Sequence, residues 1–415
     1  MASSSSNAAC NAFFRASSSE AASPIPQEVI MLSIFSLAAS SQNHLAFAEE
    51  EATRKEKIII NLFIATPTLF LKHDILKNMK LLILGGTIFL GRHIIAEALK
   101  RHHEVWVFNR GKSGPRPESA CQVISGDREN HDDLKKLSAM KFDAIIDTCG
   151  YVPRVVRMGL ELLRDAAPHY VFASTISVYA HAIPGSDETA SVMTLDNPQS
   201  EDVQKDYGGL KALCESEIRK HFPSANTIVR LGFLVGPYDR IYRFPYWLER
   251  LSAGGKVIAP GEPSDLFQLV DIRDAAAWMV LSAEKKIIGD FNLTGHARPM
   301  GDLLDTCNQV LGTKAQLIWL PRAFLTDQGV SGFDGIPYNI SDIDRGSVQQ
   351  NIQKALASGL TFRSLPETVL DTSAWLKKEG FSTKGKIGVK INAGISRTRE
   401  LEVLHHYHLI NNLPF

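Results

Sequence analysis

From residue 80 onward, strand-like and helix-like segments alternate along the chain, and this alternation limits the fold more than any other feature. Apolar runs such as KLLIL (80–84) and FDAIID (142–147) have strand length. Between such runs, segments such as FLGRHIIAEALKRH (89–102) carry apolar residues at helical spacing. Because parallel strands need crossover connections, this order predicts an α/β fold with a doubly wound parallel sheet. The pattern recurs at HEVWVF (103–108), CQVIS (121–125), HDDLKKLSAM (131–140), VVRMGLELLRDA (155–166) and YVFAS (170–174).

The pattern loosens after about residue 232, which predicts a smaller C-terminal substrate lobe. We expect an α/β domain over 79–232 and a lobe over 233–383 that is intermixed with the last strands of the sheet. A tail over 384–415 contains RELEVLHHYHLI, which is typical of an amphipathic helix. The lobe segments are FPYWLERLSAGG (244–255), IRDAAAWMVLSAE (272–284) and GDLLDTCNQVLG (301–312) as helices, with KVIAP (256–260) and GDFNL (289–293) as strands.

Residues 1–78 differ in composition from the rest. They begin with a stretch that is rich in Ser and Ala and poor in acidic residues, which is typical of a transit peptide. The alternative is a mis-assigned start, because Met79 directly precedes KLLILGG. The apolar run at 58–71 contains Asn61 and Pro67 and is shorter than the ~20 residues that span a bilayer. We therefore expect no membrane segment, and a cytoplasmic protein, or a chloroplast one if 1–78 is a transit peptide.

The net charge and the cysteine spacing argue against a nucleic-acid-binding protein, a disulfide-rich protein and a zinc protein. Lys plus Arg and Asp plus Glu both total 45, and this neutrality argues against a protein whose main partner is nucleic acid. The five cysteines are far apart and form no CxxC pair, so neither a disulfide framework nor a zinc site is expected. HHYH (405–408) is better explained by the tail helix than by a metal site.

A glycine-rich turn follows the first strand. Gly85 and Gly86 free the backbone to turn, and Gly91 lets the next helix pack close to the sheet. The start of that helix offers free N–H groups to a pyrophosphate, so the turn predicts a Rossmann-type NAD(P) site. Ile88 stands where a further glycine is usual, so the loop geometry must differ from the all-glycine form. The residues expected to line the phosphates are Gly85, Gly86, Thr87, Phe89, Leu90 and Gly91.

The end of the second strand bears on the choice of cofactor. An acidic residue there would bind the ribose hydroxyls of NAD, but the sequence has Asn109 and Arg110. A guanidinium pairs with a 2′-phosphate, which favours NADP over NAD. Asp127 follows the third strand and is placed to bind the adenine edge, or else to cap a helix.

Tyr207 and Lys211 form a candidate catalytic pair. They stand four residues apart, so a helix puts both on one face. A free phenol has a pKa of about 10, and a nearby ammonium with a positive nicotinamide can lower it. Thr175, at the end of a strand, would bind the substrate oxygen. The alternative is an ordinary pair on a surface helix.

Residues 79 to about 380 resemble an extended short-chain dehydrogenase/reductase of the nucleotide-sugar epimerase/dehydratase branch. The matching motifs are GGTIFLG (85–91), STISVY (174–179), YGGLK (207–211) and VRLGFLVGP (229–237). The resemblance implies that Thr175, Tyr207 and Lys211 are the active set and that Lys211 holds the nicotinamide ribose. It also implies that Thr148, Cys149 and Gly150 line the cofactor, and that the protein is a homodimer. The departures are Ile88, Asn109 with Arg110, and Leu231 in place of proline, so the substrate is not inherited from the better-known relatives.

The substrate is expected to be a small molecule, such as a nucleotide sugar. Arginines beside aromatic residues suit a nucleotide diphosphate and its base. The candidates are Arg243, Phe244, Tyr246, Trp247, Gln268 and Arg273. The aromatic residues could instead form a helix core, and Arg273 could pair with Asp271 or Asp274.

These observations favour an NAD(P)-dependent enzyme that transfers hydride at a hydroxyl or keto carbon, as an epimerase, dehydratase or reductase. The alternative function is RNA binding, because GGTIFLG also resembles the loop of plant chloroplast RNA-binding relatives of this fold. The neutral charge and the intact Thr175–Tyr207–Lys211 set argue against that alternative.

Overall fold

The computed structural model describes residues 78–112, 114, 119–181, 183–331, 335–379 and 393–412. The predicted transit segment lies outside these ranges except for Asn78. Within them, no helix combines the length and apolar character that a bilayer crossing requires.

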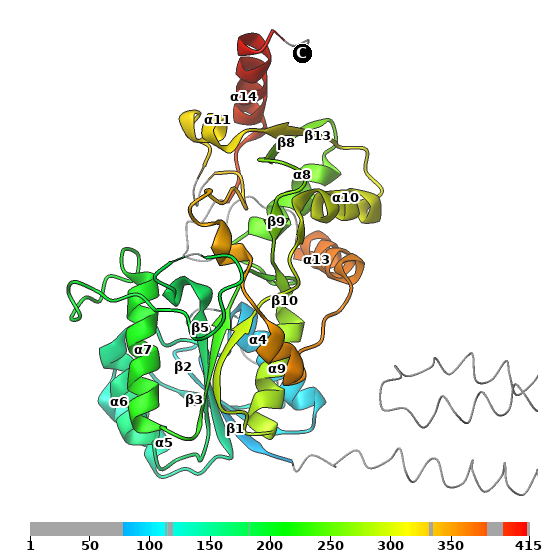
Figure 1. Cartoon of the computed structure of the whole chain (residues 1–415). Helices are drawn as coiled ribbons and strands as arrows, with labels where there is room; N and C mark the ends of the chain where they lie inside the picture. The colour runs from blue at the N-terminus through cyan, green and yellow to red at the C-terminus, as the bar shows by residue number, and fades with distance from the viewer. Residues whose placement is uncertain are drawn as a thin grey trace, which may run out of the picture. The chain divides into compact units, whose positions relative to one another are not determined.

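A seven-stranded parallel sheet forms the main layer, in the order β11-β6-β5-β4-β1-β2-β3 (Figure 1). The strand order changes direction beside β1, which is where open α/β sheets bind ligands at the carboxyl ends of their strands. The predicted Rossmann-type fold is therefore confirmed. The strands are β1 (Lys80–Leu84), β2 (Glu104–Asn109), β3 (Gln122–Ser125), β4 (Ala144–Asp147), β5 (Tyr170–Thr175), β6 (Asn226–Leu231) and β11 (Gly289–Leu293).

Helices cover both faces of this sheet (Figure 1). Successive side chains of β1 point to opposite faces: Leu82 and Leu84 pack in one core, and Leu81 and Ile83 in the other. This explains why the strands read as continuous apolar runs rather than as alternating ones. One face carries α5 (His131–Ser138), α6 (Pro153–Leu163) and α7 (Tyr207–His221), and the other carries α4 (Phe89–Lys100) and α9 (Ile272–Glu284).

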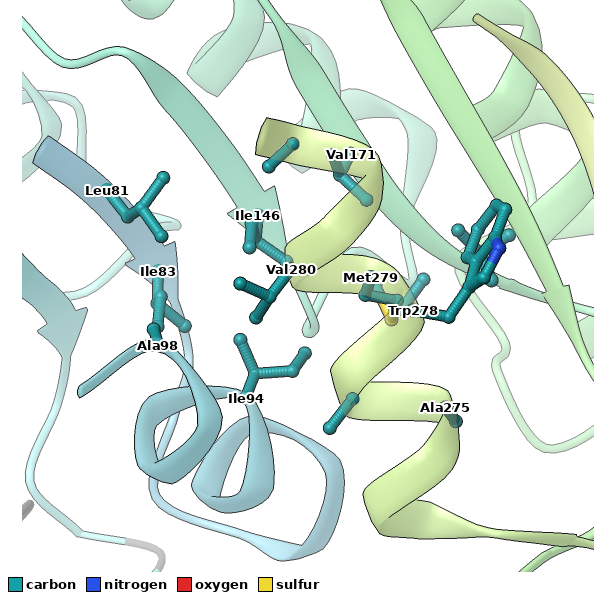
Figure 2. Packing of buried hydrophobic residues seen from close by; sticks show 14 of the residues in the cluster. Leu81, Ile83, Ile94, Ala98, Ile146, Val171, Ala275, Trp278, Met279 and Val280 are labelled. Carbon is teal, nitrogen blue, oxygen red and sulfur yellow. The ribbon is translucent and has the colours of Figure 1, made fainter. Parts of the chain in front are cut away.

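Figure 2 shows the second of these cores, in which α4 packs against α9 over the strands. Ile94 from α4 and Val280 from α9 are both fully buried there. Trp278 and Met279 extend the contact toward the other strands of the sheet. Helix α9 begins almost two hundred residues after α4 in the sequence. This core therefore packs a late segment of the chain against the first helix of the sheet layer.

A second group of elements builds its own apolar core around Trp247. Most of the predicted lobe segments form here, but α9 and β11 belong to the main sheet layer. The tail helix α14 (Arg397–Ile410) is anchored by buried Glu400, which accepts hydrogen bonds from Arg250 Nε at 2.6 Å and Ile258 N at 3.0 Å. The remaining helices are α8 (Arg243–Ser252), α10 (Met300–Leu311), α11 (Arg322–Asp327), α12 (Gln353–Ala357) and α13 (Leu365–Glu379), with 3-10 turns η1 (Ile176–Val178) and η2 (Arg345–Val348). The short strands are β7 (Leu234–Val235), β8 (Lys256–Pro260), β9 (Leu266–Phe267), β10 (Val270–Asp271), β12 (Arg298–Pro299) and β13 (Gln316–Leu320).

Candidate active site

The glycine turn after β1 uses backbone conformations that only glycine adopts easily. Gly85 has φ +102° and Gly86 has φ +86°. Ile88 instead has an extended backbone, with φ −123° and ψ 150°, and its side chain is 42% exposed. An extended residue needs no glycine, so the backbone itself explains how isoleucine is accommodated at this position.

The start of α4 fits a pyrophosphate. A Cβ on Gly91 would lie 2.6 Å from Gly86 Cα, so the turn and the first turn of the helix are in direct backbone contact. Ile88, at the N-cap, makes no side-chain capping hydrogen bond, and no acidic residue lies in the first turn. The uncapped N–H groups and the positive end of the helix dipole therefore remain for an anion.

At the end of β2, Asn109 supports the glycine turn and Arg110 stands at the surface. Asn109 Nδ2 donates to Gly85 O at 3.2 Å, and its Oδ1 accepts from Gly111 N at 2.8 Å. The half-exposed Arg110 guanidinium lies 3.7 Å from Asp127 Oδ2. Asp127 Oδ1 also accepts from Glu129 N at 3.1 Å within the loop. The helix that follows, α5, is capped by Asn130, so the helix-cap alternative for Asp127 is wrong.

The segment after β4 closes the other side of the turn. The Thr148 hydroxyl donates to Leu84 O at 2.9 Å. A Cβ on Gly85 would lie 2.6 Å from Thr148 Oγ1 and 3.3 Å from Cys149 Sγ. Thr148 and Cys149 therefore lie against the glycine turn. That residues 148–150 line the cofactor stays a prediction.

Thr175 and Tyr207 meet where β5 ends and α7 begins. Tyr207 is the first residue of α7, and Thr175 is the last residue of β5. Burial raises the pKa of Tyr207, whereas a hydrogen bond with the Thr175 side chain and the charge of Arg243 lower it to a smaller extent. The sequence predicts that the Lys211 ammonium and a positive nicotinamide together lower this pKa; in the protein alone, burial outweighs the nearby polar groups.

The Lys211 ammonium is buried beside the turn that follows β4. It donates to Gly150 O at 2.6 Å and to Ala173 O at 2.7 Å, and it lies 3.9 Å from the centre of the Phe172 ring. Burial lowers its pKa to about 8. The ammonium therefore binds one carbonyl group within β5 and one in the turn after β4, the turn whose Thr148 and Cys149 contact Gly85.

Three of the substrate candidates are core residues of α8. Phe244 and Trp247 are fully buried and Tyr246 is 8% exposed, all within the core of the second group of elements. This is the helix-core alternative raised from the sequence. Arg273 is likewise bound to Asp271, at 2.7 Å, and to Asp371.

The other two candidates, Arg243 and Gln268, lie in more favourable settings. Arg243 stacks over the Phe233 ring at 4.5 Å and is close enough to Tyr207 to lower its pKa. Gln268 is buried and exchanges two hydrogen bonds with the Gln350 backbone, at 2.9 and 2.7 Å. It also lines a cavity of about 300 Å³, together with Gly185, His296, Ala297, Gln350, Asn351, Ile352 and Gln353.

Sequence reasoning missed two buried ion pairs near the site. Arg230 on β6 binds Glu215 on α7 at 2.8 Å, and Glu215 accepts a hydrogen bond from Ser174 at 2.6 Å. Arg128 binds Asp147, the last residue of β4, at 2.8 Å. A buried acid in an apolar strand, such as Asp147 in FDAIID, was the available signal. Among the described residues, no three His, Cys, Asp or Glu side chains gather as a metal site would need.

The parallel sheet and its glycine turn place the protein among the Rossmann-type folds of the short-chain dehydrogenase/reductase class. The model of the NAD dependent epimerase/dehydratase family matches residues 81–293. This protein therefore belongs to the NAD dependent epimerase/dehydratase family.

Solved structures of other proteins share this fold. The UDP-glucose 4-epimerase of Thermotoga maritima, solved with UDP-glucose, is 17% identical, and the match has a TM-score of 0.55 over 72% of this chain and 99% of that chain. The UDP-glucuronic acid 4-epimerase of Bacillus cereus, solved with NAD, is 18% identical, with a TM-score of 0.55 over 72% and 97% of the two chains.

One relative is named for binding a stem-loop and not, as the two epimerases are, for an enzymatic activity. The chloroplast stem-loop binding protein of 41 kDa b of Arabidopsis thaliana is 28% identical over 235 residues, which is 52% of this chain. The match spans 58% of the length of that relative.

Proposed function

We propose that this protein catalyses NAD(P)-dependent hydride transfer at a hydroxyl-bearing or keto carbon of a small molecule. The observation that carries the proposal is the contact of Thr175 with Tyr207 where β5 ends and α7 begins, with Lys211 one helical turn further along α7 and bound to Gly150 O in the turn that contacts Gly85. When bound, the nicotinamide supplies the hydride acceptor or donor.

Tyr207 acts as the base that takes the proton of the substrate hydroxyl. Thr175 binds the same substrate oxygen and holds it beside the phenol. Lys211, whose ammonium binds Gly150 O and Ala173 O, also holds the nicotinamide ribose. The charge of Arg243 favours the phenolate form that Tyr207 must have before it takes the proton.

Changing Tyr207 to Phe tests this assignment. The variant is expected to keep its affinity for reduced cofactor, measured by nicotinamide fluorescence, and to lose turnover, because it keeps the ring and lacks the proton acceptor. Tyr407→Phe is the matched control, since Tyr407 stacks on Phe324 in the other core. Turnover is followed with UDP-glucose and UDP-glucuronic acid, and with any small molecule that mass spectrometry finds in the purified protein. Full activity of Tyr207→Phe would refute the assignment.

We propose NADP as the preferred cofactor, because the half-exposed Arg110 can bind a 2′-phosphate. Changing Arg110 to Ala is expected to weaken NADPH binding by about tenfold, equivalent to about 1.4 kcal/mol, and to leave NADH binding almost unchanged. An equal loss for both cofactors would contradict this role, whose strength is reduced by the nearby Asp127 carboxylate.

We further propose that the substrate is a nucleotide sugar held by Arg243 and Gln268. The supporting observations are the stacked guanidinium near Tyr207 and the cavity beside Gln268. The homodimer is also a proposal, which light scattering of the purified protein tests.

RNA binding is the second candidate function, favoured by the name of the Arabidopsis relative. It predicts stem-loop RNA affinity that falls steeply with salt and survives the Tyr207→Phe change. The balanced charge of the chain, with 45 basic and 45 acidic residues, supports the enzymatic function over this one.

A further inference from the structure

The buried ion pair of Arg128 and Asp147 contacts the turn at residues 148–150, which we propose to line the cofactor, and it has no part in the proposed chemistry. Arg128 Nη1 and Nη2 bind the two oxygens of Asp147 at 2.8 and 3.0 Å. Asp147 is fully buried, and Tyr170 donates to its Oδ2 at 2.8 Å. Buried ion pairs stabilise a fold little compared with apolar residues of the same size, so their presence calls for another explanation.

The carboxylate of this pair fixes the backbone that follows it. Asp147 Oδ1 accepts the N–H of Cys149 at 2.9 Å. Arg128 Nη1 also lies 3.1 Å from Cys149 Sγ. A Cβ on Gly150 would lie 2.6 Å from the Phe172 ring and 3.0 Å from Asp147 Oδ2, so the turn packs against both. The direction of the Gly150 carbonyl therefore depends on where the Asp147 carboxylate is held.

The Gly150 carbonyl is in turn one of the two carbonyl acceptors of the Lys211 ammonium, at 2.6 Å. The other acceptor, Ala173 O, belongs to β5 and is fixed by the sheet. Gly150 lies outside the strands, so its position is set by the turn. The contacts thus run without a break from Arg128 through Asp147 and the 149–150 turn to Lys211.

We propose that Arg128 is a positioning residue for Lys211, which it holds in place through Asp147 and the backbone of residues 149–150. The inference rests on the proposed function, because the position of Lys211 matters only if the ammonium binds the cofactor. A guanidinium suits the task because its planar fork grips both carboxylate oxygens and so fixes their orientation, which a lysine cannot do.

The test observes the Lys211 ammonium directly, by NMR of full-length protein labelled with ¹⁵N-lysine. The signal is assigned by its loss in Lys211→Met. Spectra are recorded about two pH units below the pKa of about 8, where the ammonium is protonated. In Arg128→Met, exchange of its protons with water is expected to become about tenfold faster, the factor equivalent to about 1.4 kcal/mol and to one net hydrogen bond.

Two further variants make this result interpretable. Arg128→Lys keeps the countercharge of Asp147, so it is expected to fold and to show intermediate exchange. Arg157→Met is the matched control, because Arg157 makes a bidentate pair with Glu217, at 2.9 and 3.2 Å, that does not touch residues 147–150. The control is expected to show the exchange rate of the unaltered protein.

Arg128→Lys separates loss of position from loss of charge. The titratable and charged groups that act on Lys211 are Cys214, Asp147, Glu215 and Arg128; the charge of Asp147 raises the pKa of the ammonium and that of Arg128 lowers it. Arg128→Met removes the Arg128 charge and also favours protonation of buried Asp147, so its exchange is interpreted together with that of Arg128→Lys, which keeps a cation beside Asp147. Unchanged or slower exchange in folded Arg128→Lys would overturn the inference.

The readout also separates this inference from the proposed function, because it requires neither cofactor nor substrate. Binding of NADPH and of NADH is measured on the same samples by nicotinamide fluorescence. Faster exchange in the Arg128 variants of a protein that binds neither cofactor would support the contact chain and refute the proposed function. Binding of either cofactor together with unchanged exchange would refute the contact chain and leave the proposed function standing.

Discussion

The buried ammonium of Lys211 makes the stability of the protein depend on pH in a direction that can be worked out. The side chain is 3% exposed, and burial lowers its pKa from 10.5 to about 8. Below pH 8 both the folded and the unfolded states carry the charge, so the full cost of burying it is present. Between pH 8 and 10.5 the folded state releases the proton while the unfolded state keeps it, so this group makes stability rise with pH. At ~1.4 kcal/mol per pH unit, the rise amounts to about 3 kcal/mol.

Changing Lys211 to Met isolates this contribution. Burial also raises the pKa of Tyr207, and that of Cys214 to about 12, and these groups oppose the rise by losing protons in the unfolded state first. Because both groups remain in the variant, most of their effect cancels when the two proteins are compared. The free energy of unfolding of wild type minus that of Lys211→Met is therefore expected to increase by about 3 kcal/mol between pH 7 and 10.5.

Denaturation by guanidinium chloride, followed by tryptophan fluorescence across this pH range, measures the difference. Lys141→Met, in which an exposed lysine is changed, controls for the loss of one positive charge. A difference that stays flat or falls with pH would refute the reasoning, because it would mean that the ammonium is not desolvated. The consequence for function is that the charge proposed to hold the ribose is lost as the pH rises above about 8.

Two other predictions concern stability. Gly91→Ala is expected to lower stability by about 1–3 kcal/mol, because its Cβ would meet the backbone of Gly86 at 2.6 Å, whereas Gly159→Ala in α6 has open space around it and is expected to raise stability by up to about 1 kcal/mol. Thermal unfolding with NADPH titration checks the pair, and the prediction is wrong if Gly91→Ala melts as high as Gly159→Ala. Arg230→Met is expected to cost about 3–5 kcal/mol, because it leaves fully buried Glu215 without its main partner, and Arg399→Met, in an exposed pair, about 0–1 kcal/mol. Equal losses in a denaturant titration would contradict the assignment of the network as buried.

The sequence determined the sheet and its helices because their signals are local. The apolar run of β1, the glycines after it and the helical spacing of α4 lie within about twenty residues of one another. The same local reasoning identified Tyr207 and Lys211 as neighbours on one helix, which the structure confirms.

Only the tertiary structure decided what surrounds those residues. Phe244 and Trp247 looked equally suited to a ligand or to a core, and the second group of elements buries them completely. Arg128 and Asp147 are also separate in sequence and come together because β3 and β4 end at the same edge of the sheet. In the protein alone the pKa of Tyr207 is raised, because desolvation sums over every group that packs around the phenol, and the sequence could not show which groups these are.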